Sequence, residues 1–319
     1  MKTWKIAILA ASILSGCLFS SADNVKNPIN YSINQETLVN EAFQNVSQDH
    51  LSSVITKLSS YANRSAYTQL GIDSFDWIVD HWKELTKNRT DVEITRFTHT
   101  LYKQPTIILT IKGSDPVLQN EIIILSAHGD TINNDTNDVN AVAPGADDNA
   151  SGVATISEIL RRLVELDYKP QRTIQFIVYA AEEPTSDRAS YELTRWYRQN
   201  NKNVVGVMNY DQTNYKTGPY DIVLIGDYTS VEQNAFIGNL IDTYLKVPWT
   251  TQNCGYQCSD HAAWNIEGYP ASLAFESYLE GENPNIHTHK DTFHTMNNST
   301  EHSVLFVKLG LAFAIELDK

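Results

Sequence analysis

The spacing of apolar residues along the chain alternates between two periods, one typical of strands and one typical of helices. Continuous apolar runs such as Glu121–Leu125 and Thr173–Ala180 predict strands that are buried on both faces. Apolar residues three and four positions apart, as in Ser74–Lys87 and over 149–167, predict helices with one face in the core. From residue 121 onward strands and helices follow one another in turn. This order predicts a mostly parallel sheet covered by helices on both faces.

The remaining elements follow the same two patterns. We expect further strands at 92–98, 105–111, 204–210, 221–225 and 272–275, and further helices at 48–60, 187–200, 231–245, 261–266 and 303–317. Strands 92–98 and 105–111 are joined by a short hairpin-like connection. Because no repeat or change in composition divides the chain, we expect a single α/β domain over 45–319. Residues 23–44 are polar and rich in asparagine, and we interpret them as a linker or a short pro-segment.

The charge of the chain limits its partners. The 319 residues carry a formal net charge of −14. Such an acidic surface argues against binding nucleic acid or an anionic membrane through a basic patch. We therefore expect no nucleic-acid partner, and we expect a monomer.

The N-terminus has the pattern of an export signal. Two lysines precede the apolar run Ile6–Leu14, which is too short to span a bilayer. The small residues Ser20–Ala22 suit ordinary cleavage, so we interpret 1–22 as a signal peptide and expect a secreted or periplasmic protein without a transmembrane segment. The run Leu14–Cys17 also suits lipoprotein processing, and the alternative is a chain anchored by lipid on Cys17.

Export also bears on the cysteines. Once Cys17 is removed or carries lipid, Cys254 and Cys258 remain as a pair. In an oxidising compartment we expect them to form a disulfide that shapes a short loop.

Chemistry-bearing side chains collect where predicted strands end. His128 and Asp130 follow the strand that begins at Glu121, and Asp147 and Asp148 precede the helix over 149–167. Open α/β sheets bind ligands at this edge. A structural alternative is that Asp148 or Asn149 caps the helix and His128 is a hydrogen-bonded core residue.

The other strand ends repeat the pattern. Glu182 and Glu183 follow the strand ending at Ala180, Asp211 follows Tyr210, and the loop after Phe275 holds His287 and His289. His128, one of the two later histidines, and Asp147, Glu183 and Asp211 suit two divalent ions that share a carboxylate. Adjacent residues of an extended chain point in opposite directions, so Glu182 is free to act as a base.

Several longer strings carry a resemblance to a known family. They are His128–Asp130, Ala143–Gly152, Ala180–Glu183, Asn209–Tyr215, Cys254–His261 and Ile286–Thr292. Together they resemble the M28 family of zinc peptidases and, within it, the secreted bacterial leucyl aminopeptidases of the Vibrio type. The resemblance implies a single α/β domain with a mixed, mostly parallel sheet.

The resemblance also implies roles for individual residues. Asp147 would bridge two Zn²⁺ ions, with His128 and Asp211 completing one site and Glu183 and His287 the other. Glu182 would be the general base, Asp130 would orient His128, and Tyr256 would help to hold the transition state. The implied activity is that of a secreted dinuclear zinc aminopeptidase, which removes N-terminal residues from peptides by means of a metal-bound water. Alternatives are a glutaminyl cyclase or another exopeptidase on the same fold, or a non-catalytic binding ectodomain.

The chain departs from the family pattern at several places. Gly129 stands where the family commonly has leucine, which predicts looser packing beside His128, and the loop over 184–190 is altered. The substrate-binding residues that the resemblance implies are Gln212, Ile225, Leu273, Phe275, Leu279, Glu282 and Ile286. Gln212 and Glu282 replace apolar residues of the leucine-preferring relatives. The preferred N-terminal side chain is therefore left open between a leucine-like residue and lysine or arginine.

Overall fold

Strand β3 (Glu121–His128) runs through the middle of the molecule, and its side chains alternate between two cores. Ile123 and Leu125 enter the larger core, whereas Ile122 and Ile124 enter the smaller one. This alternation is the two-residue period of a strand that is covered on both faces. The computed structural model describes residues 29–184 and 188–319, so the predicted signal peptide lies outside the described residues.

The described part of the chain forms eight strands in one sheet, in the order β1-β2-β4-β3-β5-β8-β6-β7. The neighbours β3/β4, β3/β5, β5/β8 and β6/β7 are parallel, and β1/β2, β2/β4 and β6/β8 are antiparallel. The mixed, mostly parallel sheet and the β1–β2 hairpin confirm the prediction. The other strands are β1 (Val92–Phe97), β2 (Thr106–Ile111), β4 (Thr173–Tyr179), β5 (Asn203–Tyr210), β6 (Ile222–Ile225), β7 (Trp249–Gln252) and β8 (Ala271–Phe275).

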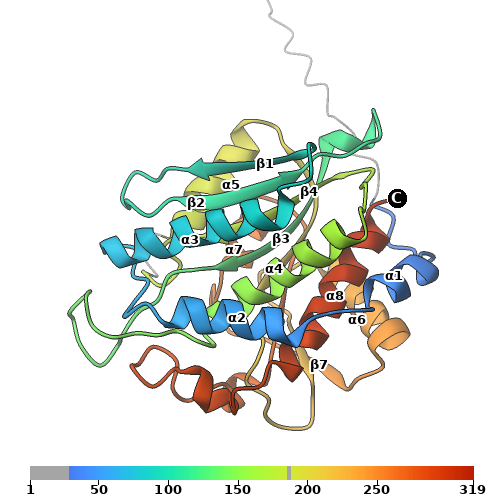
Figure 1. Ribbon diagram of the computed structural model, residues 1–319. Helices are drawn as coiled ribbons and strands as arrows, with labels where there is room; N and C mark the ends of the chain where they lie inside the picture. Colours follow the sequence, from blue (N-terminus) through green and yellow to red (C-terminus); the bar gives the residue numbers. More distant parts are fainter. Residues whose placement is uncertain (1–28, 185–187) are drawn as a thin grey trace, which may run out of the picture.

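Helices cover both faces of the sheet (Figure 1). The larger core lies beneath α1 to α4, α6 and α8, and the smaller core beneath α5 and α7. The helices are α1 (Glu36–Ala42), α2 (Gln48–Ser59), α3 (Gln69–Thr86), α4 (Ala150–Glu165), α5 (Ala189–Gln199), α6 (Val231–Leu240), α7 (His261–Ile266) and α8 (Glu301–Leu317). Among the described helices, none combines the length and apolar character needed to cross a membrane.

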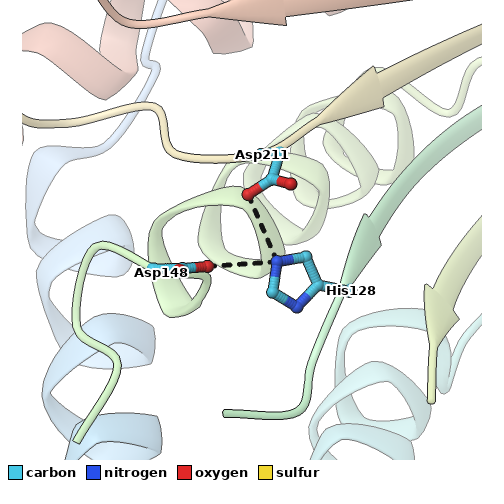
Figure 2. A group of neighbouring side chains, drawn as sticks. All are labelled: His128, Asp148 and Asp211. Atoms are coloured by element: carbon cyan, nitrogen blue, oxygen red, sulfur yellow. Dashed lines mark hydrogen bonds and ion pairs between the residues drawn. The ribbon is translucent and has the colours of Figure 1, made fainter. Parts of the chain in front are cut away.

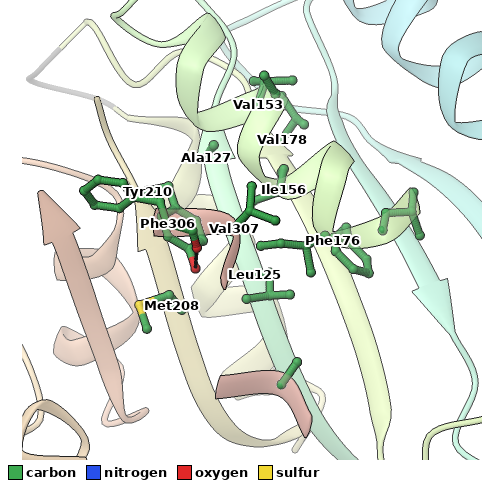
Figure 3. Packing of buried hydrophobic residues seen from close by; sticks show 14 of the residues in the cluster. Leu125, Ala127, Val153, Ile156, Phe176, Val178, Met208, Tyr210, Phe306 and Val307 are labelled. Carbon is green, nitrogen blue, oxygen red and sulfur yellow. Dashed lines mark hydrogen bonds between the residues drawn. The ribbon is translucent and has the colours of Figure 1, made fainter. Parts of the chain in front are cut away.

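The larger core is closed by α4 and α8 packing on the central strands. Figure 3 shows Val153 and Ile156 of α4 beside Leu125 and Ala127 of β3. In the same cluster the hydroxyl of Tyr210 on β5 donates a hydrogen bond to the carbonyl oxygen of Phe306 on α8 at 3.3 Å. The polar tip of a fully buried tyrosine thus has a partner, and the end of β5 is linked to α8.

The N-terminal part of the described chain corrects one expectation. Residues 36–42, which we interpreted as part of a linker or pro-segment, form α1, and Val39 and Ala42 are fully buried in the larger core. The main-chain N–H groups of Asn34 and Gln35 donate to the buried carboxylate of Glu316 on α8. "Linker" is therefore the wrong description for this segment, because its apolar side chains are part of the core that α8 also lines.

Gly129, between His128 and Asp130, allows α3 to approach the end of β3. A Cβ atom at this position would lie 2.7 Å from Cζ of Phe75 and 2.7 Å from Cγ1 of Val178. Phe75 is fully buried. The expectation of looser packing beside His128 is therefore wrong, because the ring of Phe75 occupies the space that a larger residue at 129 would need.

We predict that Gly129→Ala destabilises the protein by about 1–3 kcal/mol, because overpacking a closed core forces side chains off their preferred rotamers. Denaturant unfolding monitored by tryptophan fluorescence measures the change. In a Phe75→Leu background the same substitution should cost less, because the close contact with the ring is removed while the one with Val178 remains. A cost that does not fall in this background would contradict a contribution of Phe75 to the clash.

Candidate metal centre

The first group of site residues comes from three separate elements that end at one edge of the sheet. His128 is the last residue of β3, Asp211 follows β5, and Asp148 precedes α4. Nε2 of His128 lies 3.1 Å from Oδ1 of Asp148 and 3.2 Å from Oδ1 of Asp211 (Figure 2). All three side chains are nearly or fully buried. One imidazole nitrogen and two carboxylates thus face a common point.

A second group shares Asp148 with the first. Oδ2 of Asp148 lies 2.9 Å from Nε2 of His287, which lies 3.1 Å from Oε2 of Glu183. Glu183 follows β4, and His287 lies in the loop between β8 and α8. His289, the alternative candidate, is exposed and lies 3.9 Å from Asp135 instead. The two oxygens of Asp148 therefore face two different histidines.

This arrangement corrects the expected bridging residue. Asp148, and not Asp147, lies between the two histidines. Oδ2 of Asp147 instead accepts a hydrogen bond from Nδ2 of Asn283 at 3.2 Å, on the side away from the histidines. Adjacent side chains in this turn point in different directions, and the turn's register decides which carboxylate faces the histidines. Asn149 caps α4, since its side chain accepts from the N–H of Gly152.

Asp147 belongs to a buried acidic layer behind the two groups. Burial raises the pKa of Asp147 well above its ordinary range, and the charge of Asp291 adds to the effect. Burial likewise raises the pKa of Glu276, and the neighbouring Asp147 raises it further. Two neighbouring carboxyl groups in such surroundings favour a shared proton. Asp291 fixes the main chain at this place, because its carboxylate accepts hydrogen bonds from the N–H groups of Asp147 and Asp148.

The charge distribution of the two groups fits divalent cations. Burial raises the pKa of Glu183 to about 7, and the charge of Asp148 raises it further. Burial alone would also raise the pKa of Asp148, but hydrogen bonds from His128 and His287 hold it well below its ordinary range. Oε1 of Glu183 has no hydrogen-bond partner among the described residues. Buried carboxylates with free oxygens are normally paired with cations or metals.

Each group has the donor set of a zinc site. One histidine nitrogen and two carboxylate oxygens lie within 4.8 Å of one another in His128/Asp148/Asp211 and again in Asp148/Glu183/His287. Nitrogen and oxygen donors of this kind bind Zn²⁺, and three protein ligands leave a position open for chemistry. The residues therefore fit two ions that share Asp148.

Asp130 positions the pair of glutamates. Its Oδ1 accepts a hydrogen bond from the N–H of Glu182 at 3.0 Å, and its Oδ2 accepts from the N–H of Glu183 at 3.2 Å. The same Oδ1 lies 3.5 Å from Nδ1 of His128. Asp130 therefore connects the ends of β3 and β4, in addition to facing the imidazole that we expected it to orient.

Glu182 has a partner that the sequence did not indicate. Nη2 of Arg188 lies 2.7 Å from Oε1 of Glu182, and Nε of Arg188 donates to the carbonyl oxygen of the same glutamate. Nη1 of Arg188 donates to the carbonyl oxygen of Gln257, within the disulfide loop. Burial raises the pKa of Glu182 well above its ordinary range, and the charge of Arg188 opposes that shift. Arg188 thus ties Glu182 to the loop that carries Tyr256.

Arg64 holds the two loops that carry His128 and Asp148. Its guanidinium is fully buried and donates to the carbonyl oxygens of Gly129, Leu58, Pro144 and Gly145. Burial lowers the pKa of Arg64 to about 10, so the side chain is charged at neutral pH. Neither Arg64 nor Asp291 and Asn283 was identified from the sequence, because each acts through contacts between segments far apart in the chain.

The disulfide forms as predicted, with an S–S distance of 2.04 Å between Cys254 and Cys258. Tyr256, between the two cysteines, is 60% exposed and lies at a cavity of about 390 Å³. The candidate metal ligands and Glu182 face this cavity too. All seven expected substrate-binding residues line it: Gln212, Ile225, Leu273, Phe275, Leu279, Glu282 and Ile286.

Several known proteins are similar to this chain in sequence, in fold or in both. A probable leucine aminopeptidase 1 from Trichophyton verrucosum is 32% identical over 302 residues, which span 90% of this chain and 79% of that protein. The LapA aminopeptidase structure from Legionella pneumophila matches with a TM-score of 0.82 and 32% identity, over 92% of this chain and 78% of that one. A glutaminyl cyclase from Bacteroides thetaiotaomicron has a TM-score of 0.67 at 17% identity, over 86% of this chain and 98% of that one, and shows the common fold alone.

The family assignment agrees with the geometry. The model of peptidase family M28 matches residues 106–312, which run from β2 into α8 and include every residue of the two candidate ligand groups. Together with relatives that are 32% identical over most of their length, this match shows that the chain belongs to peptidase family M28.

Proposed function

We propose that this chain is an aminopeptidase that uses two Zn²⁺ ions to remove N-terminal residues from peptides. The observation that carries the proposal is the pair of ligand groups that share Asp148 beside the carboxylate of Glu182. The relatives named above are aminopeptidases, which supports the same activity here.

In the proposed site, His128, Asp148 and Asp211 would hold one ion, and Asp148, Glu183 and His287 the other. Bound there, the two ions would supply an activated water nucleophile at neutral pH and would stabilise the charge that develops on the attacked carbonyl; the use of paired metals in aminopeptidases is a general example of this chemistry. Asp130 would keep His128 in place, as partners of ligating histidines generally do.

Glu182 is proposed as the general base. It follows Ala181, which has a left-handed backbone conformation with φ of 50°, and its N–H is held by Asp130. Its carboxylate faces the cavity rather than either candidate ligand group. From there it would accept a proton from the nucleophile and deliver it to the leaving amine. Arg188 would keep this carboxylate from turning away.

Two other features support cleavage at a free N-terminus. The two proposed ions would give the free α-amine of a substrate a ligand position, which favours cleavage at the N-terminus. Tyr256 lies at the same cavity, and its hydroxyl would donate a hydrogen bond to the oxyanion. The complete second ligand group argues against a single-metal cyclase, and the intact Glu182 argues against a non-catalytic domain.

We also propose that the protein acts after export. The Cys254–Cys258 disulfide supports an oxidising compartment, and the N-terminal sequence supports a signal peptide over 1–22. Whether the mature chain is released or is anchored through Cys17 would be decided by mass spectrometry of its N-terminus.

A panel of chromogenic aminoacyl amides tests the activity directly. Each amide is assayed with the purified protein, after treatment with a chelator, and after zinc is added back. We expect hydrolysis that the chelator abolishes and zinc restores. Hydrolysis of N-acetylated amides at the same rate would contradict the requirement for a free N-terminus, and cyclisation of N-terminal glutamine in place of hydrolysis would favour the cyclase.

We predict that Glu182→Gln lowers kcat by about 100-fold or more while zinc content stays near that of the parent, because a general base typically contributes a factor of this size. Amide hydrolysis and elemental analysis of the dialysed protein measure the two quantities. Near-parental turnover would remove Glu182 from the proposed role, and loss of zinc would indicate that it is a ligand.

We predict opposite outcomes at two adjacent aspartates. Asp148→Asn should release most of the bound zinc, because both candidate groups lose a carboxylate ligand. Asp147→Asn should retain zinc, because Asp147 faces Asn283 and Glu276 rather than the histidines. Elemental analysis after dialysis compares the two variants, which differ by one position. Zinc loss in Asp147→Asn alone would restore Asp147 as the bridging residue.

A further inference from the structure

The cavity beside the candidate metal centre has an apolar wall. Ile225 at the end of β6 and Leu273 and Phe275 of β8 are buried and pack together in a small cluster of their own. Leu279 extends this cluster and also lines the cavity. A wall of this kind binds the hydrocarbon part of a side chain but offers no partner to a charged group.

Two polar side chains interrupt the apolar lining. Gln212 is buried, and its Oε1 has no hydrogen-bond partner among the described residues. Its main-chain N–H donates to Oδ1 of Asn149 at 3.2 Å, which fixes the residue directly after Asp211. A buried acceptor without a partner is costly, and a donor supplied by a ligand would satisfy it.

Glu282 is the second polar residue, and it is held from both sides. The carbonyl oxygen of Gly281 accepts a hydrogen bond from Oγ1 of Thr217. On the other side, Nδ2 of Asn283 donates to the carboxylates of Asp147 and Asp291. In the part of the chain that the structure describes, the half-buried carboxylate of Glu282 makes no hydrogen bond or ion pair of its own. The fold thus presents a fixed, unpaired acid at the cavity.

The cations near the cavity are already engaged. Arg188 is paired with Glu182, and His128 and His287 face the candidate ligand carboxylates. Burial raises the pKa of Glu282, and the charges of Asp148 and Asp211 raise it further. A cation placed beside Glu282 would favour the ionised form of its carboxyl group, since an opposite charge stabilises a carboxylate.

We propose that Glu282 makes this site selective for peptides that begin with lysine or arginine, an inference that rests on the aminopeptidase function proposed above. The hydrocarbon stem of either side chain would lie along the apolar wall, and the charged tip would pair with the Glu282 carboxylate. Oε1 of Gln212 would accept a hydrogen bond from the substrate side chain. A neutral aliphatic side chain would pack against the apolar wall but leave the Glu282 carboxylate unpaired.

Another role for Glu282 makes a different prediction. If its carboxylate held the α-amine, which every substrate carries, removing the carboxylate would lower kcat/KM equally for all substrates. If it pointed only into solvent, its removal would change nothing. Selectivity for a cationic side chain alone predicts an effect that depends on the substrate.

The experiment compares lysyl and norleucyl p-nitroanilides, whose side chains share an unbranched stem and differ by the ammonium group. The quantity measured is the ratio of their kcat/KM values, in the zinc-loaded parent, in Glu282→Gln and in Glu280→Gln. Glu280 is a matched control, because it is exposed, does not line the cavity and already accepts a hydrogen bond from Gln252. Each ratio is internal to one variant, so partial unfolding does not alter it.

We expect the lysyl/norleucyl ratio to fall by about tenfold or more in Glu282→Gln, because a charge pair of this kind is lost. In Glu280→Gln it should stay within about twofold of the parent, because an exposed charge is screened. An unchanged ratio in Glu282→Gln, whether kcat/KM stays constant or falls equally for both substrates, would overturn the inference. So would a parent that cleaves norleucyl but not lysyl amides. Failure of the parent on every amide would overturn the aminopeptidase proposal, and this inference with it.

Discussion

The site depends on the concentration of negative charge in a place from which water is largely excluded. Asp130, Asp147, Asp148, Glu183 and Asp291 are all buried within one region. Burying a carboxylate is costly unless it is paired or hydrogen-bonded. Two buried arginines carry permanent positive charge here. Arg188 is paired with Glu182, whereas the guanidinium of Arg64 binds the main chain of both ligand-bearing loops rather than any carboxylate. It offsets the charge without occupying a ligand oxygen, and so leaves the carboxylates free to bind ions.

The same constraint explains why each acidic residue has a separate position and partner. Asp130 and Asp291 face main-chain N–H groups, whereas Asp148 faces two histidines. Asp147 is directed toward Glu276, and burial raises the pKa of both carboxyl groups. These assignments separate acids that position the loops from acids that could bind metal, although all of them are identical or nearly identical in chemistry.

Much of the fold could be predicted from the sequence because its elements have strong periods. Most of the buried strands and long helices were found within about two residues of their observed bounds, although α3 begins at Gln69, before the predicted start at Ser74. The helix α1 was missed because only Val39 and Ala42 of its seven residues are buried, and β7 because its four residues are only partly buried. The structure of α1 and of β7 is therefore decided by tertiary packing and not by the local pattern of apolar residues.

The site was predicted as a set of strand ends but not as a set of contacts. The alternation of strands and helices placed His128, Glu183 and Asp211 at one edge. The choice between Asp147 and Asp148 depends on the register of one turn, which Asp291 and Asn283 fix from a loop more than 130 residues away. No local pattern carries that information. Arg188 was hidden for the same reason, because its partners lie in the strand end before it and in the disulfide loop far beyond it.

The double-sided burial of β3 has an evolutionary consequence. Inserting or deleting one residue within Glu121–His128 would exchange the side chains of the two cores and turn His128 toward the opposite face of the sheet. In the loop that follows, Asn134 still contacts His287, but residues 135–140 are exposed and carry no candidate ligand. A change of length within 135–140 would therefore leave the candidate ligands in place, whereas the strand a few residues before it must keep its length unchanged.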